Sequence, residues 1–223
     1  IGIALFISHY APRKIAQGLG YVIDLLAAVP SVVFGLWGIK VLAPALIPLY
    51  TWLTENLGFL PFFTPPASGT GRPVLTVAIV LAVMIIPIIT AICREIFLQT
   101  PKLHEEAALA LGSTRWEMIQ MAVLPFGRAG IVSAAMLGLG RALGETMVVA
   151  MVLSPAIVIS FVLTGSVNPN TIAGYIALSF PEAHDIGVNT LIATGLVLFV
   201  ITLVINSIAR YIVNRRKAFS GAN

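Results

Sequence analysis

Two opposite charges stand in an otherwise apolar stretch, "GLGRALGETMVVAM", which covers residues 138–151. Arg141 carries a planar guanidinium whose donors can engage two oxygens of a phosphate group at once. Glu145 follows four residues later, a spacing that puts both side chains on one face of a helix, where they can neutralise one another. The stretch therefore indicates either an anion-binding site or an ion pair that fixes the register of a helix.

The composition indicates that a bilayer surrounds this stretch. Of the 223 residues, 58% are hydrophobic and 10% are charged, which is too apolar for a soluble globular protein of this length. Uncharged runs at 73–93 and 186–209 can each cross the hydrocarbon core as a helix, and a third run at 129–154 is broken only by Arg141 and Glu145. A charge at the centre of such a helix costs on the order of 3 kcal/mol, so we expect both side chains to face protein or water.

Three clusters of basic residues predict the orientation of the chain, because Lys and Arg beside short loops tend to stay on the cytoplasmic side. The clusters are Arg13 and Lys14; Arg94, Lys102, Arg115 and Arg128; and Arg210, Arg215, Arg216 and Lys217. We therefore expect these residues and the C-terminus on the cytoplasmic side, and the turn-rich loop at about 50–72 on the outside.

The crossings of this path are expected at residues 15–50, 73–95, 129–154 and 186–209. Pro30 disfavours helix at the residue before it, so "YVIDLLAAVP" can lie in the interface before the first of these spans begins. The basic C-terminal tail lies on the cytoplasmic side only if the segment 155–180 crosses the membrane twice or not at all. A segment that re-enters the membrane without crossing it fits the second case. We expect the opening "IGIALFIS" to be the end of a helix that begins upstream. The predicted fold is an all-α, polytopic membrane helix bundle with a single domain, 1–223.

The segment 100–125 predicts two short amphipathic helices on the cytoplasmic side. Thr100 can cap the first, and Gly112 suits the left-handed residue that ends it. Thr114 and Glu117 have the spacing of a capping box, so a second helix should follow directly and run towards the end of the segment. The apolar faces are Leu103, Ala107 and Leu111 in the first helix and Trp116, Ile119 and Val123 in the second. The pattern alone also fits an interfacial helix that merely covers the bundle.

The residues of this segment resemble a known motif. "EAALALGSTRWEMIQMAVLP" is similar to the cytoplasmic loop of ABC importer permeases, which reads E-A-A, three residues, Gly, nine residues, then I-x-L-P. The positions that fit are Glu106, Ala107, Ala108, Gly112, Leu124 and Pro125, and Ala122 stands where the family usually has Ile. Stretches at 21–38, 105–147 and 191–206 resemble the phosphate-specific branch of this family, so the resemblance is spread through the chain.

The resemblance implies that the first helix of 100–125 docks in a groove of an ATPase subunit and transmits its closure to the membrane helices. Glu106, Ala107 and Gly112 would serve that coupling. It also implies about five to six spanning helices in the whole protein and three kinds of partner. These are a second, similar permease, a dimer of ATPases that holds ATP and Mg, and an external phosphate-binding protein. The expected location is the plasma (inner) membrane of a bacterium or archaeon.

The expected function is that of a transmembrane permease subunit of an ATP-driven phosphate importer, forming half of the translocation pathway by alternating access. Arg141 and Glu145 are the expected substrate-binding residues. In this hypothesis Glu145 holds Arg141 while the cavity is empty and releases it to phosphate, which prevents both an unpaired charge and excessively tight capture.

Other functions stay open from the sequence. The substrate could be another oxyanion, sulfate or molybdate, and an ion-coupled secondary transporter could use the charged pair as a relay. A role in sensing phosphate status is a third alternative. The sequence contains no G-x-x-x-x-G-K-[ST] phosphate loop, and its histidines have no metal-ligand spacing: His9, His104 and His184. We therefore expect no catalysis, no metal and no cofactor in this chain.

Overall fold

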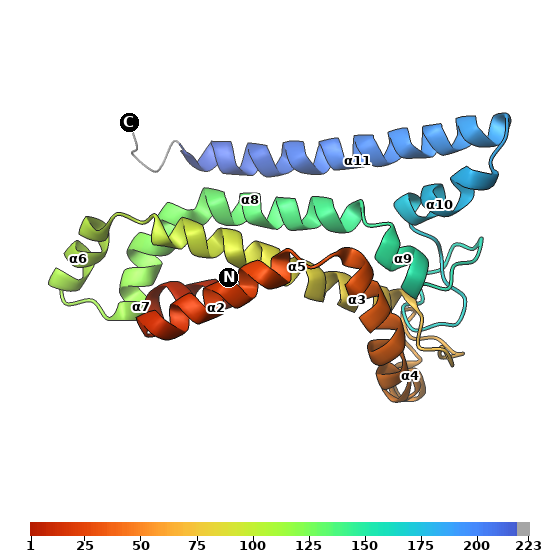
Figure 1. The fold of residues 1–223 in the computed structure, drawn as a ribbon, viewed down its shortest axis with the longest axis horizontal. Coiled ribbons are helices and arrows are strands. Elements are labelled where there is room, and N and C mark those ends of the chain that lie inside the picture. Colours follow the sequence, from red (N-terminus) through yellow and green to blue (C-terminus); the bar gives the residue numbers. More distant parts are fainter. Residues whose placement is uncertain (218–223) are drawn as a thin grey trace. The chain divides into compact units, whose positions relative to one another are not determined.

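The structure, a computed structural model, describes residues 1–217, with side chains described as far as Tyr211 (Figure 1). Within this range the chain is all-α, as the sequence predicted, and extended segments pair only in two isolated β-bridges. The side chains of Arg215, Arg216 and Lys217, which contribute to the predicted orientation, lie outside the described residues, as does the chain after Lys217.

Two compact units make up the chain. Unit 1 contains residues 1–28, 85–141 and 202–223, and unit 2 contains 29–84 and 142–201. The helices α5 (Val74–Leu98) and α11 (Ile186–Lys217) contribute residues to both. A single permease domain over the whole chain stays a prediction.

Unit 1 gathers helices that are far apart in the sequence. Besides parts of α5 and α11, its elements are α1 (Gly2–Leu5), the π-helical turn η1 (Phe6–Tyr10), α2 (Arg13–Ala27), α6 (Lys102–Ala110), α7 (Arg115–Met118), the π-helical turn η3 (Ile119–Val123) and α8 (Leu124–Leu143). Its buried core consists of Ala4, Leu5, Cys93, Phe97, Met118, Ile119, Val123 and Ala134. This cluster ties α1 and α7 to α5 and α8.

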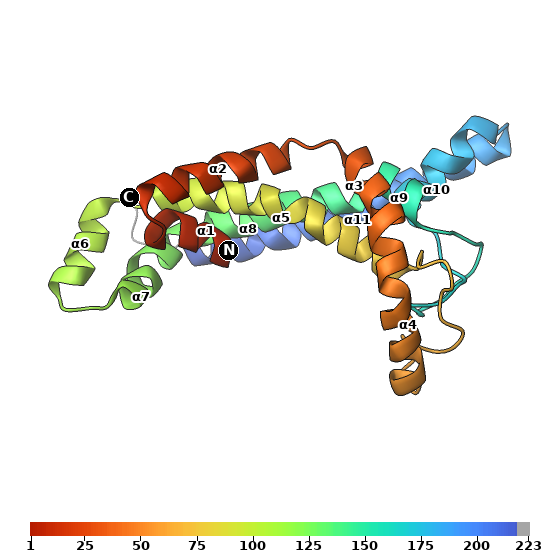
Figure 2. The ribbon, with the colours of Figure 1, turned by 60° about the horizontal axis from the view of Figure 1, so that its bottom comes forward.

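Small residues and one cation bring helices of unit 1 close together. A Cβ atom added at Gly138 of α8 would lie 2.8 Å from the Cδ1 of Ile89 in α5, so the Ile89 side chain would have to shift to admit it. The helix α2 runs alongside the second half of α5 (Figure 2). There a guanidinium nitrogen of Arg94 lies 3.4 Å from Asp24 of α2 and 2.6 Å from Glu95.

Unit 2 is built around the short helix α9. Its elements, besides parts of α5 and α11, are α3 (Ser31–Trp37), the π-helical turn η2 (Gly38–Leu42), α4 (Ala43–Leu57), α9 (Met147–Val152), α10 (Ile172–Ser179) and the 3-10 turn η4 (Phe180–Glu182). The helix α9 packs between α3 and α10, and Val148, Val149 and Val152 are almost fully buried. Gly35 of α3 leaves the space that Met151 fills, because a Cβ there would lie 3.0 Å from the Met151 sulfur.

Four helical stretches among the described residues are long and apolar enough to cross a membrane: Ser31–Leu57, Val74–Leu98, Arg115–Leu143 and Ile186–Tyr211. The second and fourth confirm the predicted helices there. The break at Pro30 is also confirmed, because α2 ends at Ala27 and the next helix begins at Ser31. The segment 155–180 contains no helix of crossing length, and its re-entry into the membrane stays a prediction.

The predicted span at 129–154 is wrong at both ends. Helix runs without interruption from Arg115 through α7, η3 and α8, and it ends at Leu143. We expected Pro125 to mark the end of the second short helix, but it lies in the first turn of α8, directly after η3. A π-helical turn is wider than an α-helical one, which accommodates a residue that has no N–H to donate. At the other end, residues 144–146 separate α8 from α9 and belong to neither helix.

A close backbone approach in unit 2 gives a first testable prediction. Gly71 has a φ of +67°, and a methyl group there would overlap the carbonyl oxygen of Ala43. We expect Gly71→Ala to lower the free energy of unfolding by about 2–4 kcal/mol, because left-handed strain adds to a clash with backbone that cannot move aside. Thermal unfolding of the purified protein in detergent measures the loss. Gly69→Ala is the matched control in the same loop, since no heavy atom lies within 4 Å of its added Cβ, and equal melting temperatures for both variants would contradict the prediction.

Candidate functional site

The turn between α6 and α7 is organised largely as the sequence predicted. Gly112 has a φ of +83°, the left-handed conformation that ends a helix at little cost for glycine. Thr114 and Glu117 form the predicted capping box: the Thr114 N–H donates to Glu117 Oε2 at 2.7 Å, and the Glu117 N–H donates to Thr114 Oγ1 at 3.3 Å. The prediction that Thr100 caps α6 is wrong. The helix begins after Pro101 with no side-chain cap, and the buried Thr100 hydroxyl has no hydrogen-bond partner among the described residues.

The helix α6 has one side on the core of unit 1 and its opposite side uncovered. Ala108 packs against the core, and Glu105 Oε1 lies 3.4 Å from the Nε2 of His9 in η1. The predicted apolar face points away from both, and Leu103 and Leu111 are 78% and 89% exposed. Exposed apolar side chains in such an arrangement mark a surface that another molecule can cover.

The three residues that the resemblance assigned to coupling lie in this uncovered region. Glu106, Ala107 and Gly112 are all exposed, and Ala107 belongs to the same face as the two leucines. The neighbouring Ala108 is partly buried against the core of unit 1 instead, so consecutive alanines of the motif have different neighbours. The arrangement fixes α6 from one side and leaves the other side free for a partner.

The second site begins near the end of α8. Arg141 lies three residues beyond Gly138, on the same side of the helix as the glycine that packs against α5, and its side chain is exposed. The guanidinium of Arg141 makes no hydrogen bond or ion pair with another residue in the described part of the chain. The expectation that Arg141 and Glu145 share one helix is wrong, because α8 ends at Leu143. Their spacing of four therefore does not place them on one helical face.

Glu145 instead holds the start of α9. Its Oε1 accepts hydrogen bonds from the N–H groups of Met147 at 3.1 Å and Val148 at 3.2 Å. These amides have no partner within the helix, and a negative charge is favourable at the positive end of the helix dipole. Its second oxygen, Oε2, makes no hydrogen bond to any described residue. An acidic residue two places before an apolar helix is the signal that could have revealed this role.

Arg72 holds the other end of the same helix. Its Nη2 donates to the carbonyl oxygen of Met151 at 2.8 Å, its Nε donates to that of Val152 at 3.0 Å, and Nη2 also reaches Leu153 at 3.4 Å. A cation at the C-terminal carbonyls complements the dipole, so α9 carries opposite charges at its two ends, each of the favourable sign. The sequence indicated only a loop at Arg72.

Asn168 connects three segments around this cap. Its side chain is fully buried; the amide donates to the carbonyl oxygens of Arg72 and Ser154, and its Oδ1 accepts from the N–H of Val74. The sequence "GSVNPN" around Asn168 indicates a turn, and no local pattern predicts partners so far away in the chain. Buried polar groups need such partners, so Asn168 fixes the loop after α9 against the start of α5.

The cap at the end of α9 gives a second prediction. We expect Arg72→Gln to lower the free energy of unfolding by about 2–4 kcal/mol, because carbonyl groups lose charge-assisted hydrogen bonds. Arg72→Lys should recover only part of the lost free energy of unfolding. Its ammonium group keeps the interaction with the helix dipole but lacks the planar, forked set of donors of a guanidinium. Thermal unfolding in detergent measures both, with exposed Arg115→Gln as the control. A melting temperature of Arg72→Gln that matches the control would mean that the cap adds nothing to stability.

No group of three or more His, Cys, Asp or Glu side chains among the described residues is placed to hold a metal ion. The hydrogen bonds that charged side chains make around α9 come from Glu145 at its start and Arg72 at its end.

Comparison with known proteins identifies the family. A family model described as "Binding-protein-dependent transport system inner membrane component" matches residues 1–218. The chain is 48% identical over 217 residues to "Phosphate transport system permease protein PstC 2" of Mycobacterium tuberculosis, a match that covers 95% of this chain and 66% of that protein. It is 42% identical over 228 residues to PstC of Mesorhizobium japonicum, with 100% and 68% covered. It is 37% identical over 227 residues to PstC of Haemophilus influenzae, with 99% and 70% covered.

These matches run through both candidate sites. The chain spans about two thirds of the length of the curated relatives that it matches. The resemblance to ABC importer permeases is confirmed by the family model and by 37–48% identity over nearly the whole chain. The chain belongs to the family of binding-protein-dependent transport system inner membrane components, and the relatives to which it is 37–48% identical are PstC phosphate transport system permeases.

Proposed function

We propose that this chain is the permease subunit of an ATP-driven phosphate importer and forms half of the translocation pathway. One observation carries the proposal. The helical run Arg115–Leu143 begins at the capped corner beside the uncovered helix α6 and contains Arg141 near its other end. From Arg115 to Arg141 the run measures roughly 40 Å at 1.5 Å per residue. A displacement of α6 by an ATPase would thus reach the guanidinium through one continuous element.

Arg141 is the proposed phosphate ligand. A guanidinium can donate two parallel hydrogen bonds to a phosphate group, and the Arg141 side chain is exposed. Glu145 is the second residue of the proposed site. Its Oε1 holds α9, and the unpaired Oε2 can offer a negative charge that balances Arg141 while no phosphate is bound. Phosphate then replaces the carboxylate as the partner of Arg141, which keeps binding reversible.

The proposed partners follow from this division of labour. ATP and Mg bind to a PstB-like ATPase dimer, whose groove takes the exposed face of α6, and the chain itself does not hydrolyse ATP. A PstA-like second permease completes the pathway, and a PstS-like external protein delivers phosphate. In alternating access, ATP binding moves α6 and the helices open the cavity to one side of the membrane at a time. The C-terminus is proposed to face the cytoplasm.

The names of the relatives support phosphate over sulfate or molybdate as the substrate. The uncovered face of α6 supports an ATP-driven transporter over an ion-coupled one, because a transporter without an ATPase has no partner for that face. Competition in vesicles that contain the assembled transporter tests both points. We expect uptake of radiolabelled phosphate to require internal ATP and to resist a tenfold excess of sulfate or molybdate. Equal inhibition by all three anions would move the assignment to a general oxyanion importer.

A further inference from the structure

A buried histidine joins the N-terminal helix to α6. The His9 side chain in η1 is 8% exposed, and its Nε2 lies 3.4 Å from Oε1 of Glu105, whose side chain is 23% exposed. On the other edge of the ring, Nδ1 lies 2.7 Å from the hydroxyl oxygen of Ser8, and that hydroxyl is also 3.3 Å from the carbonyl oxygen of Leu5. The imidazole is therefore held between its own helix and α6.

One arrangement of the hydrogen bonds around the ring lets it donate to Glu105. If the Ser8 hydroxyl donates to Nδ1, the neutral ring carries its proton on Nε2. Nε2–H of His9 then donates to the carboxylate of Glu105.

The helix α6 packs against η3 and α7, and the contact between Glu105 and His9 joins it to η1. No residue of α6 is fully buried. Ala108 is partly buried on the core, and its carbonyl oxygen accepts a hydrogen bond from the Ser113 hydroxyl at 2.7 Å. Among the described residues, Glu105 alone on α6 makes a side-chain hydrogen bond to a different element, and that bond goes to His9. This pair is therefore the side-chain hydrogen bond that links α6 to η1.

We propose that His9 is a positioning residue that transmits movement of α6 directly to η1 and α1, in parallel with the covalent route through α7 and α8. The inference rests on the proposed function, since it assumes that an ATPase moves α6. The route is continuous: His9 is in η1, and Ala4 and Leu5 of α1 belong to the same core cluster as Met118. Movement of α6 thus reaches α1 through His9 and α8 through α7. The core cluster between these helices makes them shift together.

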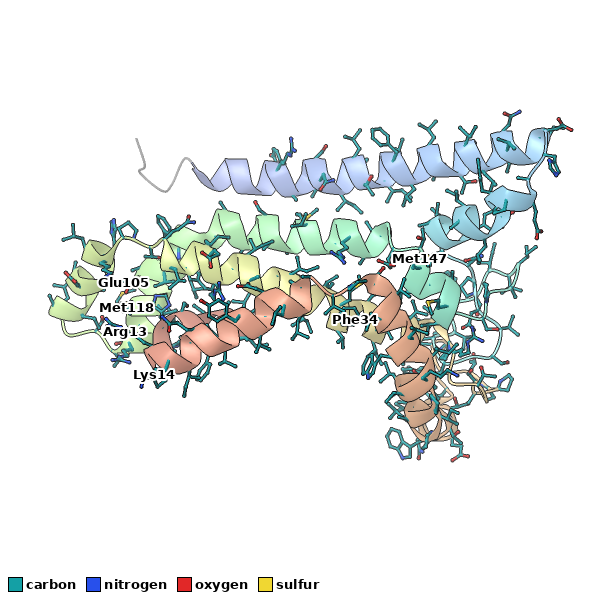
Figure 3. All side chains as sticks on the ribbon, viewed as in Figure 1. Arg13, Lys14, Phe34, Glu105, Met118 and Met147 are labelled. Atoms are coloured by element: carbon teal, nitrogen blue, oxygen red, sulfur yellow. The ribbon has the colours of Figure 1, made fainter. Side chains whose placement is uncertain are left out.

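If a change at Glu105 impairs transport, the loss of a charge near α6 would be a different explanation from the loss of its contact with His9. The structure offers a control for this general electrostatic effect. Figure 3 shows Arg13 and Lys14, at the start of α2, at the same end of unit 1 as Glu105 and Met118. Both cations are exposed, and neither makes a hydrogen bond or ion pair with Glu105 in the described part of the chain. Lys14→Gln therefore removes a nearby charge without breaking the contact between His9 and Glu105.

The experiment measures phosphate imported per ATP hydrolysed in vesicles that contain the assembled transporter. For Glu105→Met, which removes the acceptor oxygens, and for His9→Ala we expect this ratio to fall roughly three- to tenfold, with ATP hydrolysis retained and the KM for phosphate unchanged. The double variant should be no worse than either single variant, because both remove the same contact. His9→Lys should recover most of the ratio, since an ammonium group can pair with Glu105, whereas Lys14→Gln should match the wild type.

An unchanged ratio in Glu105→Met would overturn the inference even if His9→Ala failed to assemble, because Glu105→Met keeps the length of the side chain and removes the carboxylate acceptor. Equal losses in Lys14→Gln and Glu105→Met, or additive losses in the double variant, would also overturn it. Failure of the proposed function gives a different result, namely a wild-type transporter whose phosphate uptake does not depend on ATP.

Discussion

Arg141→Gln is expected to abolish phosphate uptake while the transporter still assembles. The guanidinium is exposed and makes no hydrogen bond to another described residue, so its removal leaves no orphaned partner in this chain. Two charge-assisted hydrogen bonds to phosphate are worth about 1.5–3 kcal/mol each, and their loss weakens binding on the order of 100-fold or more. Initial rates of radiolabelled phosphate uptake over a range of concentrations, with the amount of assembled complex measured by size-exclusion chromatography, give the result.

Arg141→Lys is the graded control for this prediction. It keeps the positive charge but loses the planar fork, so we expect uptake between that of the wild type and that of Arg141→Gln, with a raised KM. If Arg141→Gln takes up phosphate as fast as the wild type, Arg141 and Glu145 do not bind phosphate and have a structural role. Loss of assembled complex in Arg141→Gln would show that the side chain supports the fold or the partner interface instead.

Leu103→Asp combined with Leu111→Asp is expected to release the ATPase from the complex. Both leucines are largely exposed in this chain, so the change costs little stability here, but a partner that covers them would have to bury two carboxylates. Burial of a leucine contributes about 1.5–3 kcal/mol, so losing two weakens docking on the order of 100-fold. Co-purification of the ATPase with the tagged permease, and phosphate-stimulated ATP hydrolysis, measure the effect.

Lys102→Glu is the matched control, because it introduces a negative charge on α6 away from the face of Leu103 and Leu111. It should leave the ATPase bound. If the double leucine variant keeps the ATPase and full transport, α6 is an interfacial helix that only covers the bundle. Loss of the ATPase in both variants would indicate a charge effect on the whole helix rather than an apolar docking face.

Local chemistry explains why much of the fold could be predicted from the sequence. Pro30 separates two helices because it restricts the residue before it, and the Thr114–Glu117 box marks a helix start through hydrogen bonds only three residues apart. Gly112 adopts the left-handed conformation that its position required. The uncharged runs became α5 and α11 because a crossing helix needs only length and apolar residues.

The parts that the sequence did not predict depend on contacts between distant residues or on competing local choices. The spacing of Arg141 and Glu145 indicated one helix, but the carboxylate of Glu145 caps a new helix, which competes with continuing the old one. Arg72 finds its carbonyl partners only when the loop before α5 meets α9. Pro125 stands in the first turn of α8, directly after η3, where a local pattern predicted a helix end.

One measurement tests the central claim most directly: ATP hydrolysis and phosphate uptake recorded in the same vesicles, for the wild type and for Arg141→Gln. The account predicts that wild-type uptake requires ATP and stops without it. In Arg141→Gln the basal hydrolysis of ATP should persist, because α6 is unaltered, while uptake is lost. Phosphate uptake by the wild type without ATP would contradict the assignment of this chain to an ATP-driven importer.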